Sequence, residues 1–144
     1  MSDLAEPVPL RPLPLPDDAS APFWAAAREH RLELQRCTAC GKWNHAPSLA
    51  CPSCGNLDLG YEQASGKGTL FSWTVIKEPP APGFQGRVPL IVAVVELAEQ
   101  PHLLMVANLL NVTEAELELG MPLQVTFETV CEECTLPQFV RAEG

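Results

Sequence analysis

Two Cys-x-x-Cys pairs constrain the fold of this 144-residue chain more than any other feature. Cys37 and Cys40 form the first pair, Cys51 and Cys54 form the second, and ten residues separate them. Each pair is followed directly by glycine, which gives the backbone the freedom that a tight turn around an ion needs. Because thiolates at this spacing can converge on one ion, the sequence predicts a tetrahedral zinc site with Cys37, Cys40, Cys51 and Cys54 as ligands.

We expect this zinc to be structural. All four ligands are cysteine, which leaves no position for water or substrate, as a Lewis-acid role would require. The segment from about Arg36 to Gly60 is too short to bury its own core, and a structural zinc can supply about 10–16 kcal/mol of apparent free energy instead. A disulfide framework or unpaired buried thiols are disfavoured because the N-terminal sequence does not resemble a secretion signal.

A third pair, Cys131 and Cys134, differs from the first two because no glycine follows it and Glu132 and Glu133 lie between the thiols. Three interpretations remain open: a redox dithiol, a second metal half-site, or two thiols on a turn. Redox pairs usually open a helix in a βαβ unit that lowers the thiol pKa, whereas this pair stands among strand-like residues and negative charge. The setting therefore favours two thiols on a turn.

Charge and hydropathy disfavour two classes of partner. Residues 1–77 carry seven Lys/Arg and eight Asp/Glu, whereas residues 78–144 carry two and ten, so the net charge of -9 lies mostly in the second half. An acidic second half is a poor partner for the phosphates of nucleic acids. The most apolar run, Val88 to Val95, is too short to cross a bilayer, so we expect a cytoplasmic protein without membrane association.

The first part of the chain is rich in proline, with six prolines among residues 1–22. This composition predicts an extended arm that either lies on a partner subunit or has no fixed structure. Ser20 fits the N-cap of a short helix with Pro22 in its first turn. At helical spacing, one face of this helix holds Phe23, Ala27 and His30. An alternating segment, Leu32–Gln35, then leads as a strand into the first cysteine pair, so residues 23–60 should form a helix plus a zinc ribbon.

Strand-like segments dominate residues 61–144. After the glycine-rich Ser65–Gly68, they are Thr69–Ile76, Leu90–Leu97, Leu103–Leu110 and Leu123–Glu128. Thr113 and Glu116 fit a capping box that opens one or two helical turns before Gly120. Because one helix is inserted before a late strand, we predict a five-stranded OB-fold barrel. The predicted fold class is mainly β, with a short helix, a zinc ribbon and this barrel.

Short motifs along nearly the whole ordered chain, from about Pro22 to Arg141, together resemble a known family. They are Phe23-Trp24, Leu34-Gln-Arg-Cys37, Cys51-Pro-Ser-Cys54-Gly55, Gly66-Lys-Gly68-Thr69-Leu70, Pro82-Gly83-Phe84, Val92-Ala-Val-Val-Glu96-Leu, Gly120-Met-Pro122 and Leu136-Pro-Gln-Phe139. The chain is similar to the uncharacterised-domain family that joins a rubredoxin-like zinc ribbon to an OB-fold and is encoded beside thiolases and related acyl-CoA enzymes.

That resemblance implies an accessory subunit of thiolases, lipid-transfer-protein-type aldolases or 3-hydroxy-3-methylglutaryl-CoA synthases, which helps to hold an acyl-CoA in the partner's tunnel. It also implies that the four ribbon cysteines bind zinc. Cys131 and Cys134 depart from the family pattern, which leaves open a family-atypical role for them. His30, His45 and His102 lie in no recognisable nucleophile motif, so we expect no catalysis by this chain alone. His45, between the two cysteine pairs, is either a solvated or ribbon-packing residue or a spare ligand.

An acyl-CoA ligand would require an apolar groove and cations for its phosphates. Phe71 and Trp73 alternate onto one strand face and, with Phe84 on the proline-rich loop, could form the groove. Barrel core is the favoured interpretation for Phe71 and Trp73, so Phe84 is the preferred candidate. Because residues 78–144 hold only two cations, the phosphates should lie toward the helix and ribbon, unless the cations there form an ordinary solvated face. Those cations are Arg28, Arg31, Arg36 and Lys42. Charge reversal at Arg31 or Arg36 should then weaken CoA binding without changing the zinc content.

Two other functions remain open. Zinc ribbons and OB-folds also bind nucleic acids, with aromatic residues such as Phe71 and Trp73 as stacking platforms, but the acidic barrel lacks the basic groove that such sites use. The chain could also be a scaffold that bridges two enzymes without contacting a ligand. Acyl-CoA binding with and without the partner separates this scaffold from a ligand-positioning subunit.

Overall fold

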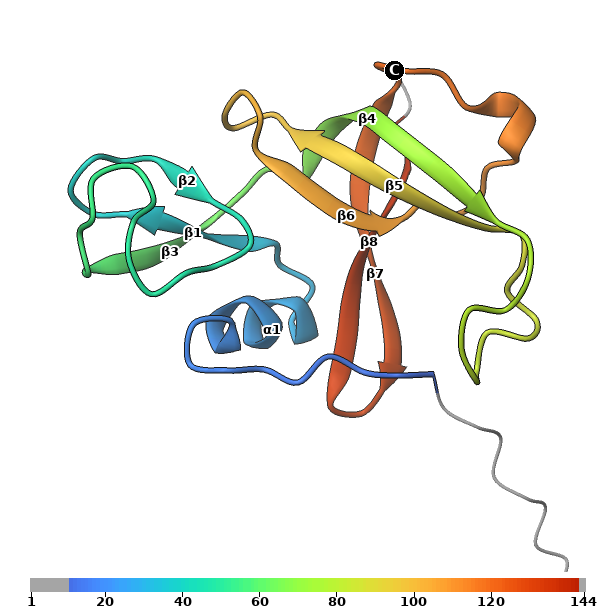
Figure 1. Ribbon diagram of the computed structural model, residues 1–144, viewed down its shortest axis with the longest axis horizontal. Helices are drawn as coiled ribbons and strands as arrows, with labels where there is room; N and C mark the ends of the chain where they lie inside the picture. Colours follow the sequence, from blue (N-terminus) through green and yellow to red (C-terminus); the bar gives the residue numbers. More distant parts are fainter. Residues whose placement is uncertain (1–10, 143–144) are drawn as a thin grey trace, which may run out of the picture.

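The computed structural model describes residues 11–142 of the chain, so the first ten residues of the predicted arm lie outside the described residues (Figure 1). The described part of the arm is anchored to the rest of the chain at Arg11, whereas Leu15 is 92% exposed. Arg11 is 7% exposed, and its guanidinium lies 5.6 Å from the ring centroid of Phe84 and 3.1 Å from a carboxylate oxygen of Glu128. Contact of the arm with a partner subunit stays a prediction.

Helix α1 (Ala21–Arg28) begins at the predicted N-cap, Ser20. The side chains of Ser20 and Asp17 each accept a hydrogen bond from the other residue's backbone N–H, at 3.0 and 2.7 Å, which fixes the turn before the helix. The helix ends before His30, which has a φ of 61° and stacks on Phe127 with ring centroids 5.3 Å apart. The prediction that His30 shares the helix face was therefore wrong. None of the helices in residues 11–142 is long and apolar enough to cross a membrane.

Three short strands form the ribbon: β1 (Glu33–Cys37), β2 (Trp43–Asn44) and β3 (Leu59–Gln63). They pair antiparallel in the order β2-β1-β3. Only β1 was predicted. Because β2 has two residues and β3 contains Gly60, neither carries the long alternating pattern that predicts a strand.

The second sheet has the order β6-β5-β4-β7-β8, with antiparallel pairing between neighbours. Its strands are β4 (Lys67–Ile76), β5 (Leu90–Leu97), β6 (Leu104–Asn108), β7 (Pro122–Cys131) and β8 (Cys134–Arg141). A parallel bridge between Leu109 and Phe139 joins the end of β6 to β8 and closes the sheet on itself. The five-stranded OB-fold is thus confirmed, and the ribbon lies to one side of it, with α1 between the ribbon and the β7–β8 hairpin (Figure 1).

Within the barrel, the predicted elements differ from the observed ones in two places. Strand β8 was not predicted, because Pro137 lies inside it and its polar and apolar residues do not alternate cleanly. The inserted helix, η1 (Glu114–Glu116), is one 3-10 turn rather than one or two α-helical turns. Its capping box is confirmed: the Glu116 carboxylate accepts hydrogen bonds from the backbone N–H and hydroxyl of Thr113 at 2.8 and 2.9 Å.

Two glycines allow β4 to start in close contact with its neighbours. Gly66 has a φ of 78°, and a Cβ atom there would lie 2.3 Å from Cγ1 of Val125. A Cβ atom at Gly68 would lie 2.7 Å from the carbonyl oxygen of Glu96. The core behind them is filled by strand residues, and its largest fully buried side chains are Leu34, Leu70, Val95, Leu97, Leu123 and Phe139.

Candidate metal centre and apolar groove

The four predicted zinc ligands converge in the ribbon. The Sγ atoms of Cys37, Cys40, Cys51 and Cys54 all lie within 4.8 Å of one another. The Cys37–Cys54 and Cys40–Cys51 sulfur pairs are each 3.6 Å apart. Tetrahedral zinc with sulfur ligands at about 2.3 Å places the sulfur atoms about 3.8 Å apart, so this donor set fits the ion in both chemistry and spacing.

Backbone N–H groups at the turns stabilise negative charge on the sulfurs. The N–H of Cys40 donates to Cys37 Sγ at 3.4 Å and lowers the pKa of Cys37 to about 6. The N–H groups of Cys54 and Ser53 likewise lower the pKa of Cys51. The hydrogen bond from the Asn56 N–H also lowers the pKa of Cys54. Burial and the neighbouring cysteine sulfurs outweigh this bond and raise the pKa of Cys54 to about 11. Four thiolates at this distance therefore require a cation, and zinc would supply that charge and cross-link the ribbon.

His45 lies outside this sulfur cluster. Its ring packs on Phe23 with centroids 5.4 Å apart, and burial lowers the pKa of His45, which favours the neutral imidazole. Among the described residues, Nδ1 of His45 is buried and has no hydrogen-bond partner. Of the two predicted roles for His45, the contacts favour packing over zinc ligation. His102 is exposed, on the β5–β6 turn.

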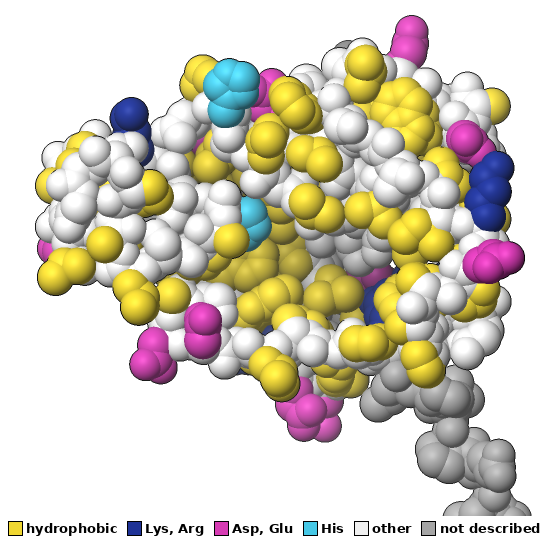
Figure 2. Space-filling model, in the orientation of Figure 1, with side chains coloured by type: hydrophobic (Ala, Val, Ile, Leu, Met, Phe, Trp, Pro, Cys, Tyr) yellow, Lys and Arg dark blue, Asp and Glu magenta, His cyan; other side chains and the backbone are white. Residues whose placement is uncertain are grey.

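An apolar groove of about 480 Å³ lies between α1, the segment after β2, and the barrel. Figure 2 shows a hollow with hydrophobic side chains in it at this place, between α1 and strands β6 and β8. Val106 of β6 is 65% exposed, which is unusual for a valine in the middle of a strand. The groove residues used below are Phe23 and Trp24 of α1, His45, Val106 of β6, and Leu136 and Gln138 of β8.

A buried polar network adjoins the groove at Gln138. The Gln138 side chain accepts from the backbone N–H of Asn108 at 2.7 Å and donates to Glu128 at 3.0 Å. Glu128 also pairs with Arg11 at 3.1 Å and with Arg87 at 2.5 Å. Despite its burial, the pKa of Glu128 is lowered by the hydrogen bond from Gln138 and the two guanidinium groups. The network ties the arm, the proline-rich loop and β7 together beside the groove.

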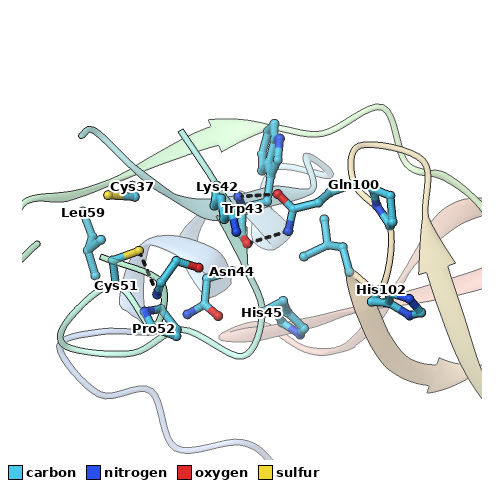
Figure 3. A pocket seen from close by; sticks show the side chains of 13 residues that line it. Cys37, Lys42, Trp43, Asn44, His45, Cys51, Pro52, Leu59, Gln100 and His102 are labelled. Atoms are coloured by element: carbon cyan, nitrogen blue, oxygen red, sulfur yellow. Dashed lines mark hydrogen bonds between the residues drawn. The ribbon is translucent and has the colours of Figure 1, made fainter. Parts of the chain in front are cut away.

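One side chain fixes the ribbon against the barrel. The amide of Gln100, on the β5–β6 turn, accepts from the N–H of Trp43 at 3.0 Å and donates to its carbonyl oxygen at 3.1 Å (Figure 3). These two bonds mimic the pairing of a neighbouring strand with β2. Gln100 and Trp43 line a smaller cavity of about 260 Å³, and Lys42 and His102 line it as well. Nothing in the sequence around Gln100 indicated this contact.

The predicted CoA-binding cations are not equivalent. Arg31 pairs with Glu29 and, at 3.1 Å, with Glu33. Arg36 pairs with Glu62 at 2.7 Å, and its guanidinium lies 4.8 Å from the Trp43 ring centroid. The other two, Arg28 at the end of α1 and Lys42 on the ribbon, are exposed. Within residues 11–142, no carboxylate lies within 4.0 Å of the cationic group of either residue.

The three predicted aromatic residues do not line the groove. A register shift between Leu70 and Ser72 makes Phe71 the extra residue of a β-bulge, so its simple alternation with Trp73 is broken. Phe71 is exposed, whereas Trp73 packs partly buried against the barrel core. Phe84 is covered by Arg11. The groove residues were missed because they come from four distant segments, and an isolated Val106 resembles any strand residue.

Comparison with known proteins identifies the family. Residues 24–60 match the model of the "ChsH2, rubredoxin-like zinc ribbon domain", and residues 61–128 match the "ChsH2, C-terminal OB-fold domain". The chain also matches the solved structure titled "Ltp2-ChsH2(DUF35) aldolase", with a TM-score of 0.81 and 36% identity over 89% of this chain and 98% of that one. This chain belongs to the ChsH2-type DUF35 family. The resemblance predicted from the sequence is thereby confirmed.

Two curated relatives of this DUF35 protein are subunits of hydratases. One is a "Probable enoyl-CoA hydratase alpha subunit" of Thermomonospora curvata, 38% identical over 93% of this chain and 41% of the relative. The other is the "3-oxo-4,17-pregnadiene-20-carboxyl-CoA hydratase alpha subunit" of Mycobacterium tuberculosis, 34% identical over 73% of this chain and 32% of the relative. The matched region thus spans about two fifths or less of these relatives.

Proposed function

We propose that the chain is a non-catalytic accessory subunit that associates with an acyl-CoA-processing enzyme of the aldolase or thiolase type and helps to position its thioester substrate. Membership of the DUF35 family supports the accessory role, because the family includes subunits of hydratases and a component of an aldolase complex. In this proposal zinc is structural, and the reacting groups belong to the partner.

The apolar groove is the observation that carries the proposal. Its volume of about 480 Å³ lies in the range of sites that bind small molecules, and apolar residues dominate its lining. Among the described residues, Nδ1 of His45 is the buried side-chain polar atom of the groove without a hydrogen-bond partner, and it could meet a polar atom of an acyl or pantetheine chain. A groove that gains its full burial only with a ligand or partner also explains the exposure of Val106.

We place the nucleotide phosphates toward the predicted cations on the helix and ribbon. Arg28 and Lys42 are the strongest candidates, because Arg31 and Arg36 already pair with carboxylates. Since phosphates bind cations mainly through charge, reversal at Arg28 or Lys42 should weaken CoA binding more than reversal at Arg31. Titration calorimetry of acyl-CoA with the partner complex of each variant measures this order.

The groove is tested with Val106→Glu and a matched control, Leu119→Glu. The two side chains are exposed to similar extents, 65% and 68%, but Leu119 lies outside the groove. Val106→Glu should reduce partner association or acyl-CoA affinity by at least about tenfold, roughly 1.4 kcal/mol, whereas Leu119→Glu should leave both unchanged. Association without any acyl-CoA contact would favour the scaffold alternative, and binding of single-stranded oligonucleotides at low salt would favour a nucleic-acid role.

A further inference from the structure

The β7–β8 hairpin carries the two cysteines that the zinc site does not use. Cys131, the last residue of β7, and Cys134, the first of β8, are register partners across a two-residue turn formed by Glu132 and Glu133. Figure 1 shows this hairpin extending past the other barrel strands, with its turn beyond α1. The turn residues Glu132 and Glu133 are exposed, so the pair lies beside an exposed end of the fold, away from the ribbon sulfurs.

The register brings the two thiols within reach of a covalent bond. Directly opposed residues of antiparallel strands have Cα atoms about 4.5–5.5 Å apart, and disulfides join Cα atoms about 4.4–6.8 Å apart. Both cysteines are free thiols. Within residues 11–142, the only cluster of three or more potential metal ligands is the ribbon site, so the hairpin thiols do not form part of a second such cluster.

The two thiols differ in exposure. Cys131 is half-buried, whereas Cys134 is buried, with 8% of its surface exposed. Burial raises the pKa of Cys134, and the neighbouring Cys131 acts in the same direction. An external reagent should therefore react first at Cys131, and Cys134 should react only with a sulfur delivered beside it.

We propose that Cys131 and Cys134 form a reversible disulfide by exchange with a low-molecular-weight disulfide such as oxidised glutathione. The Cys131 thiolate attacks one sulfur of the reagent and releases one thiolate, leaving a mixed disulfide on Cys131. Cys134 then attacks the Cys131 sulfur and expels the second thiolate. The two cysteines are oxidised by two electrons, the reagent is reduced to two thiols, and these take up the two protons.

This site differs from helix-borne redox pairs, which is why the sequence setting argued against it. The hairpin supplies proximity through its register, with no helix N-terminus to activate a thiol. The bond would fix the hairpin end, two residues before Leu136, which lines the groove. The inference does not depend on the proposed function.

The test uses the full-length, zinc-loaded protein treated with oxidised glutathione, then alkylated under denaturing conditions and digested with trypsin. Cleavage separates the cysteine pairs: residues 37–42 and 43–67 carry the ribbon cysteines, and residues 88–141 carry only Cys131 and Cys134. We expect the 88–141 peptide to lose alkylation at both positions together and to lose two hydrogens in mass. Zinc content should remain unchanged, and a reducing thiol should restore both alkylations.

Two single variants test the order of attack. Cys134→Ala should stop at a glutathione adduct on Cys131, whereas Cys131→Ala should form an adduct on Cys134 far more slowly. The proposal is overturned if the wild-type peptide stays doubly alkylated or carries two separate adducts. Equal adduct rates in the two variants would overturn the assigned order. The wild-type result stands even if a variant folds poorly.

Discussion

The ribbon and the barrel are similar in backbone pairing but are held together by different forces. Of the three ribbon strands, only β1 contains buried residues, and Leu49 and Leu57 in the ribbon loops are each 78% exposed. The barrel instead buries residues along β4, β5, β6, β7 and β8, including Phe139 at 0% exposure. Apart from β1, whose Leu34 joins the core of the barrel, a zinc ion held by the four sulfurs would do in the ribbon what apolar burial does in the barrel.

The largest expected effect is the loss of a zinc ligand. Because zinc supplies about 10–16 kcal/mol to such a site, Cys54→Ser should abolish stoichiometric zinc and unfold the ribbon while the barrel stays folded. Zinc analysis and hydrogen exchange measure this, with loss of amide protection expected in β1, β2 and β3 only. The matched control is Cys131→Ser, which should keep the zinc. Equal loss of protection in the barrel would show that the two regions are not held independently.

A glycine substitution in the barrel should destabilise the barrel and leave the zinc site unchanged. Gly66→Ala introduces a Cβ atom 2.3 Å from Val125 at a residue whose φ is 78°, so it should lower the free energy of unfolding by about 3 kcal/mol. Denaturant titration measures the change, and zinc content should stay constant. Gly86→Ala is the control, because within residues 11–142 no atom beyond its two chain neighbours lies within 4 Å of the added Cβ. Similar destabilisation by both variants would contradict the close packing described for Gly66.

The joint between the two regions should show a smaller effect. Gln100→Ala removes both hydrogen bonds to the Trp43 backbone and should cost about 1–3 kcal/mol. Hydrogen exchange should increase at β2, while the zinc site and the barrel core keep their protection. Gln63→Ala, at an exposed strand end, is the control and should leave exchange at β2 unchanged. Unaltered exchange at β2 in Gln100→Ala would mean that the ribbon is oriented by other contacts.

The smallest effect concerns the pH dependence of the polar network. Because the folded-state pKa of Glu128 is lowered, the unfolded state takes up its proton first as the pH falls. The stabilisation is present above the ordinary carboxyl pKa of about 4.3 and is lost as the pH falls through the folded-state value. In urea unfolding at a series of pH values, Glu128→Gln should reduce the loss of unfolding free energy at acidic pH, whereas Glu78→Gln, at an exposed site, should not. The same loss of unfolding free energy in Glu128→Gln as in the wild type would exclude the Glu128 carboxylate as its source.

Local patterns explain which features could be predicted from sequence. The cysteine spacing, the capping box of Thr113 and the alternation in β5 each lie within a short segment, so they indicated the ribbon, the turn and the barrel. The groove joins α1, His45, β6 and β8, which no local pattern connects. The pairing of Arg11 with Glu128 across more than a hundred residues is also a property of the fold alone.

The central claim is that this chain serves another enzyme's active site. The most direct measurement is native mass spectrometry of the tagged chain purified from its host, with Val106→Glu and Leu119→Glu in parallel. We predict a stoichiometric complex with an acyl-CoA-processing enzyme in the wild type and in Leu119→Glu, and its loss in Val106→Glu. Isolation of the wild-type chain without such an enzyme, or thioester turnover by the chain alone, would contradict the account.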